Sequence, residues 1–288
     1  MIRKLVLALL LAVPGPVFSQ EKIKVVATSS DLKALVEAVG DARVEVESLA
    51  APEQDPHSME LKPAQLARLR RAALIVRVGL DHEPWLSRLS APGIPVLDAS
   101  RNVRLLQTET PRLRTERAAH VHAYGNTHYW LDPQNAEPIT AAVLEALVKL
   151  SPADTGGFQR NRDFFLSALQ KKIENWKKSL KPFEGTRVVV MHDSWIYFAE
   201  RFGLQIVAAA EPNPGVPPSP AELAALFKRM RGAGVKILIT DPHSDSALVR
   251  QIAAQGGARP VTLLTSGNDY VELFDENIRR MLMALKDK

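Results

Sequence analysis

Three of the seven histidines in the 288-residue chain stand in loop-like segments rich in proline, aspartate or aromatic residues. They are His57 in DPHSMELKP, His128 in THYWLDP and His192 in MHDSW. Neutral imidazole is a good ligand for zinc and neighbouring transition ions, and three imidazoles leave a fourth position for a carboxylate or water. Together these residues could therefore bind a divalent metal ion.

Each of these histidines also has an ordinary interpretation as a polar surface or capping residue. The three are far apart in the sequence, and no HExxH or HxxxH pair places two of them on one helix face. A shared site therefore requires a fold that brings three separate loops together.

The first part of the mature chain alternates between strand and helix patterns. Apolar strand-like runs are predicted at 22–30, 43–50, 73–79 and 94–100, and helical patterns at 30–40, 62–72 and 83–89. Ser30 is the predicted N-cap of the first helix and Gly40 its end, while Pro63 suits the first position of the second. Such alternation predicts a parallel sheet covered by helices.

Residues 102–126 lack this regularity and are predicted to form a loop, and helix resumes near residue 133. A long helix follows at 155–180, with an apolar side composed of Phe158, Phe165, Leu169, Ile173, Trp176 and Leu180. The strand and helix alternation then restarts at 186 and ends in a helix that reaches about residue 286. Ser219 and Glu222 form a capping-box pattern.

These patterns predict an α/β protein of two lobes, each with a mostly parallel sheet flanked by helices, joined by one long rigid helix. The predicted boundaries are a signal peptide at 1–19, an N-terminal lobe at 20–152, the connecting helix at 153–181 and a C-terminal lobe at 182–288. Binding groups gather at the carboxyl ends of parallel strands. The three histidines could therefore meet in the cleft between the lobes.

In THYWLDP, Asp132 and Pro133 are predicted to begin the following helix. Tyr129 and Trp130 are predicted to anchor the loop by packing. His128 would then be held at the cleft.

The N-terminus and the composition indicate export. Arg3 and Lys4 precede a short apolar run and a Pro-Gly-Pro, as in a secretory signal that is cleaved near Ser19. The chain has no cysteine, which excludes disulfides, cysteine metal sites and a thiol-linked lipid anchor. Cleavage would lower the formal charge from +5 to +3, because two cations leave, and the remaining cations are scattered. We therefore expect a soluble periplasmic monomer that binds no nucleic acid.

Four segments, in matching order, resemble the zinc- and manganese-type solute-binding proteins of metal ABC importers. The segments are DPHSMELKPAQLARLRRAALIVRVGLDHEPWL, HYWLDPQNA, MHDSWIYFAERFGL and EPNPGVPPSPAELAAL. The resemblance covers nearly the whole mature chain. It implies two α/β lobes that hold a metal between them and deliver it to a membrane permease, and it assigns His57, His128 and His192 as metal ligands.

The resemblance is incomplete after the last predicted strand. Many members of the family place an aspartate ligand there, whereas the matching positions here are about Leu264 and Thr265. The fourth ligand could be Asp241, Asp269, a water or an anion, and both aspartates could equally serve in a cap or turn.

Four further histidines are left out of the primary site and are expected to be exposed: His82, His120, His122 and His243. Zinc-specific members often carry a histidine-rich loop ahead of the second ligand. His120 and His122 resemble a very short version of it.

Three nitrogens and one oxygen favour Zn²⁺, with Mn²⁺ or another divalent transition metal as the alternative. An exported zinc hydrolase is the alternative from another class, because three histidines and an open position also form a catalytic arrangement. Glu211 would be its best carboxylate, although a role in bracing its loop or on a surface that meets the permease is preferred. An adhesion or interaction protein with an incidental metal is a third possibility. We predict a metal receptor without enzymatic activity.

Overall fold

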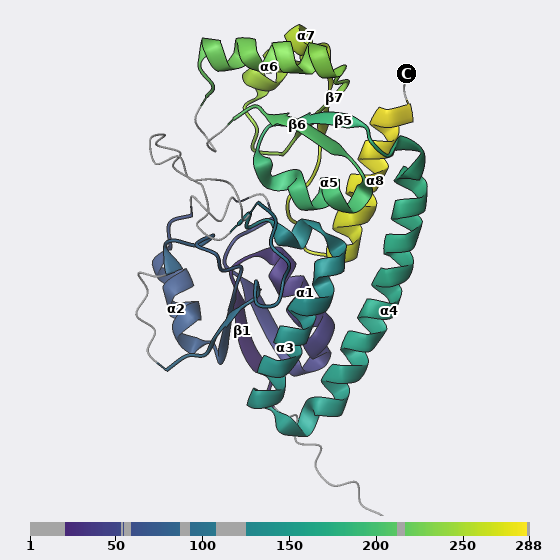
Figure 1. The fold of residues 1–288 in the computed structure, drawn as a ribbon. Helices are drawn as coiled ribbons and strands as arrows, with labels where there is room; N and C mark the ends of the chain where they lie inside the picture. Colours follow the sequence, from purple (N-terminus) through teal and green to yellow (C-terminus); the bar gives the residue numbers. More distant parts are fainter. Residues whose placement is uncertain are drawn as a thin grey trace, which may run out of the picture.

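The computed structural model describes residues 21–52, 54, 59–86, 93–107, 125–211 and 217–286. Two four-stranded parallel sheets form its framework (Figure 1). The first has the order β2-β1-β3-β4 and the second the order β6-β5-β7-β8, so both halves use the same topology. The strands are β1 Ile23–Ala27, β2 Val44–Ser48, β3 Leu74–Arg77, β4 Val96–Asp98, β5 Arg187–Val190, β6 Gln205–Ala209, β7 Ile237–Thr240 and β8 Arg259–Thr262.

Helices cover both faces of each sheet. In the first lobe, α2 lies on one side and α1 and α3 lie on the other; in the second, α6 and α7 lie opposite α5 and α8 (Figure 1). The helices are α1 Ser30–Gly40, α2 Pro63–Arg71, α3 Ala136–Leu150, α4 Thr155–Leu180, α5 Ile196–Phe202, α6 Pro220–Ala233, α7 Ser246–Gly256 and α8 Tyr270–Lys286. Among the described residues, no helix combines the length and apolar character needed to cross a membrane.

The predicted long helix is confirmed over the expected residues. α4 runs along both lobes, and at about 1.5 Å per residue its 26 residues extend roughly 39 Å (Figure 1). Its predicted apolar side is buried except for the half-buried Phe165. The C-terminal helix α8 lies against α4, where Asp275 accepts hydrogen bonds from Lys172 Nζ at 2.6 Å and Trp176 Nε1 at 2.9 Å.

One apolar core joins the two lobes. Alternate strand residues point to opposite faces of a sheet, so Val25 and Val76 face this core whereas Val26 and Ile75 pack towards α2. The same core continues through α1, α3 and α4 to α5, α8 and the inner face of the second sheet. The lobes are therefore parts of one packed unit.

Most predicted boundaries agree with the structure to within a few residues. The N-cap of the first helix is Ser29, one residue before the predicted Ser30, because the Ser29 hydroxyl accepts a hydrogen bond from the Leu32 amide. The capping box of Ser219 and Glu222 is confirmed. In the segment predicted as a helix at 83–89, a turn at 84–85 leads to a 3-10 helical residue at Leu86, and residues 87–92 lie outside the described part of the chain.

Two phenylalanines of α4 test the joined core. Phe158 is fully buried and Phe164 is 80% exposed, so Phe158→Ala should lower the free energy of unfolding by about 3–5 kcal/mol and Phe164→Ala should change it little. Because the core spans both lobes, calorimetry should record a single transition that shifts as a whole. Two separate transitions, with only one of them moved by Phe158→Ala, would contradict a shared core.

Candidate metal site

His192 lies between two carboxyl groups at the end of β5. Its Nδ1 atom is 3.5 Å from Glu211 Oε2 and its Nε2 atom is 3.7 Å from Asp241 Oδ2. Glu211 and Asp241 follow β6 and β7, the two strands that flank β5. The carboxyl ends of three adjacent parallel strands thus bring one imidazole and two carboxylates together.

This cluster is buried but incompletely hydrogen-bonded. The side chains of Glu211 and Asp241 are 6% and 4% exposed, and that of His192 is 15% exposed. Within the described ranges, Asp241 Oδ2 and His192 Nδ1 have no hydrogen-bond partner. Buried polar atoms are nearly always satisfied, and an exception indicates a functional role or a missing ion or water.

His128 is held next to the loop that carries His192. Asn126 Oδ1 accepts from the His128 amide at 3.0 Å and lies 3.2 Å from its Nδ1 atom. Asn126 also donates to the Asp193 carbonyl at 3.0 Å, and Ser194 Oγ is 3.4 Å from His128 Nε2. The structure therefore brings together the loops of two of the three predicted ligands, one from each lobe.

The roles predicted for the residues around His128 are confirmed. Tyr129 and Trp130 are buried; Tyr129 donates to the Val78 carbonyl at 2.7 Å and Trp130 to the Thr265 carbonyl at 2.9 Å. Asp132 accepts from the Gln134 amide and begins a short helical turn at Pro133. Its carboxylate also takes two hydrogen bonds from Arg201, which fixes the segment against α5.

His82 is buried, so the prediction that it is exposed was wrong. The residue is 1% exposed, its Nδ1 lies 2.9 Å from Thr127 Oγ1, and its ring stands edge-on to that of His128 at 5.5 Å. The neighbouring Glu83 accepts hydrogen bonds from two backbone amides and from Thr28, and burial raises its pKa. Glu83 thereby fixes the turn that packs His82 against His128.

Of the other residues considered for the site, some lie outside the described ranges and others have a described position. His57, His120 and His122 lie outside the described residues. His243 is exposed, as predicted. Asp269 accepts from the Val271 and Glu272 amides at the start of α8, in the capping role considered for it. Among the residues with a described position, no three His, Asp or Glu side chains are arranged as a metal site, and His57 is not among those residues.

Comparison with known proteins identifies the family. The sequence profile of the family "Zinc-uptake complex component A periplasmic" (ZnuA) matches residues 25–284, which is most of the chain. The chain belongs to this family. The high-affinity zinc uptake protein ZnuA of Yersinia pestis is 25% identical and aligns with 92% of this chain and 88% of its own length. The Paracoccus denitrificans protein of the same name is 27% identical, with 81% of each chain covered.

Solved structures of ZnuA-like proteins share the fold. A crystal structure of ZnuA superposes with a TM-score of 0.81 at 24% identity, covering 92% of this chain and 99% of the other. FpvC of Pseudomonas aeruginosa, in complex with Mn²⁺, gives a TM-score of 0.77 at 23% identity and covers 92% and 97%. These similarities confirm the predicted architecture of two parallel sheets.

The loop after β8 binds the first lobe instead of presenting a carboxylate. Ser266 donates to Asp31 Oδ2 at 2.5 Å, and the Gly267 amide donates to Asp31 Oδ1 at 3.2 Å. Asp31 belongs to the first turn of α1 and is fully buried. Burial raises the pKa of its carboxyl to about 7, although both hydrogen bonds favour the charged form.

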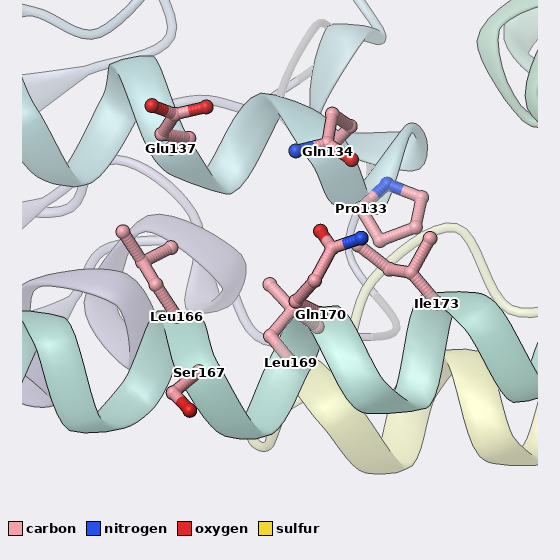
Figure 2. Close-up of a pocket in the computed structure, with 8 residues that line it drawn as sticks. All are labelled: Pro133, Gln134, Glu137, Leu166, Ser167, Leu169, Gln170 and Ile173. Carbon is pink, nitrogen blue, oxygen red and sulfur yellow. The ribbon is translucent and has the colours of Figure 1, made fainter.

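A separate groove of about 300 Å³ lies between α4 and the segment that follows Asp132 (Figure 2). Its lining comes from Pro133, Gln134, Glu137, Leu166, Ser167, Leu169, Gln170 and Ile173. This lining holds one carboxylate and no histidine, so the groove lacks the donor set of a transition-metal site.

The buried Asp31 gives a testable dependence of stability on pH. Its pKa is raised from 3.8 to about 7, so the folded state binds the proton more tightly and this group's contribution to stability is lost as pH rises from about 4 to 7. The loss amounts to about 4 kcal/mol by linkage. Urea unfolding of Asp31→Asn at pH 4 to 7 should lack this decline. A decline equal to that of the unmodified protein would refute the assignment.

Proposed function

We propose that this chain is a periplasmic receptor that captures Zn²⁺ between its two lobes and delivers it to the permease of an ABC importer. The main support is the joining of the His128 and His192 loops, from opposite lobes, at the carboxyl ends of the strands. Family membership supplies the transport context. The bound metal is the cargo of the protein.

His57, His128 and His192 are the proposed ligands. In the sequence, His57 follows β2 of the first sheet and His192 follows β5 of the second sheet. His128 is positioned from both lobes through Asn126 and Ser194. Three imidazoles suit Zn²⁺ better than Mn²⁺, which prefers more oxygen ligands. Mn²⁺ or another divalent transition metal is the alternative cargo.

The protein is further proposed to be exported by the signal at 1–19, to lack a lipid anchor and to act as a monomer. The proposed lobes are 20–152 and 182–288, joined by 153–181. Glu211, the carboxylate considered for a hydrolase, is 7% exposed, so it is excluded from a surface that meets the permease. The proposal assigns no catalytic activity to the chain.

Movement of the lobes is expected to be small. Closing a wide hinge would require bending α4 and separating the core that α4 shares with both sheets. Adjustment of loops around the metal is therefore the expected response to binding.

Zinc titration of the mature protein tests the function. The protein should bind one Zn²⁺ per chain. His57→Ala, His128→Ala and His192→Ala should each weaken binding at least tenfold, because loss of a residue that only hydrogen-bonds to a metal ligand already lowers metal affinity by about 10–100-fold. Calorimetry with a competing chelator measures this affinity, and His243→Ala, at an exposed position, serves as the matched control.

Absence of zinc binding by the unmodified protein, or an affinity that is unchanged in all three variants, would reject the proposed site. Hydrolysis of esters or phosphoesters that depends on zinc and disappears in His192→Ala would instead support the enzyme alternative.

A further inference from the structure

We propose that Asp241 supplies the fourth, oxygen ligand of the bound metal and that Glu211 is a positioning residue that orients His192. This inference rests on the metal-binding function proposed above. It gives the chain a ligand from the end of β7, in place of one from the loop after β8.

The spacing of the two donor atoms fits a shared cation. Asp241 Oδ2 and His192 Nε2 are 3.7 Å apart. Two ligand atoms bound to one tetrahedral Zn²⁺ at about 2.0–2.1 Å are about 3.4 Å apart. A side-chain movement of a few tenths of an ångström would therefore let both atoms bind one ion.

Local contacts fix Asp241 and leave one oxygen available. The Asp241 amide donates to Ser244 Oγ at 3.1 Å, and Asp241 Oδ1 accepts from the His243 amide at 3.1 Å. These bonds direct the remaining oxygen, Oδ2, toward His192. Of all aspartate and glutamate oxygens in the described part of the chain, Oδ2 of Asp241 is the one that is both buried and without a hydrogen-bond partner.

Glu211 lies on the other side of the His192 ring. Histidines that bind metal through one ring nitrogen commonly donate the other N–H to a carboxylate, which fixes the tautomer and the ring orientation. Glu211 Oε2, at 3.5 Å from Nδ1, is placed for that role once the ring is drawn into position. Nε2, which faces Asp241, is then the nitrogen that binds the metal.

The other carboxylates considered for this position are engaged elsewhere. Asp269 caps α8 through two backbone amides. Asp31 binds Ser266 and Gly267, and the loop that contains those residues carries no carboxylate between Leu263 and Gly267. Asp241 is therefore the described carboxylate that best completes the ligand set.

The test compares Zn²⁺ affinity and the visible spectrum of the Co²⁺-loaded protein in Asp241→Asn, Asp241→Ala, Glu211→Gln and Asp269→Asn. Both Asp241 variants should lose at least tenfold in affinity and should show altered Co²⁺ d–d bands, because a ligand is replaced. Glu211→Gln should lose about 10–100-fold with bands little changed. Asp269→Asn should match the unmodified protein, since asparagine also caps helices well.

Circular dichroism of the metal-free variants establishes that each is folded. If His192→Ala loses zinc but both Asp241 variants keep the affinity and Co²⁺ spectrum of the unmodified protein, Asp241 is not a ligand and the proposed function stands. If Asp269→Asn changes the spectrum instead, the assignment moves to Asp269. Failure of the unmodified protein to bind zinc would overturn the proposed function and this inference together.

Discussion

The apolar core shared by the two lobes is the constraint on which the site depends. The inner faces of both sheets, through residues such as Val76 and Val190, pack into one body with α1, α4 and α8. The carboxyl edges of the two sheets are consequently held close to one separation, and loops from either edge can place ligands around one shared site. A flexible joint between independent lobes would not provide that precision.

Polar contacts between the lobes add to the apolar core in fixing the segment around His128 against the second lobe. Trp130 reaches the Thr265 carbonyl, Tyr270 donates to the Trp130 carbonyl, and Tyr197 donates to the Asn126 carbonyl. Each bond joins a segment next to His128 with the second lobe. Because buried hydrogen bonds are costly to break without replacement, these contacts oppose separation of the lobes. They also keep His128 close to the loop of His192.

The sequence predicts the alternating elements, the long helix and the anchoring of His128 because those features depend on local periodicity and capping. The sequence patterns do not predict contacts that depend on the order of the strands in a sheet. Nothing near His82 indicates that its ring meets that of His128, and the prediction of exposure failed because Glu83 turns the chain inward after β3. Likewise, Glu211 and Asp241 flank His192 only because β6 and β7 lie on either side of β5, an order that the alternation of patterns does not specify.

The surroundings of His192 also explain why a cation should be favoured there. Two carboxyl groups and an imidazole are withdrawn from solvent, and burying such groups without a counterion is costly. His192 lies within 3.5 Å of Glu211 Oε2 and within 3.7 Å of Asp241 Oδ2. A divalent cation that enters between His192 and Asp241 would replace lost hydration with direct coordination, while Glu211 remains to hold the other side of the ring. Relief of buried negative charge would then add to the affinity that the imidazoles provide, and the sign of that charge disfavours anions as the cargo.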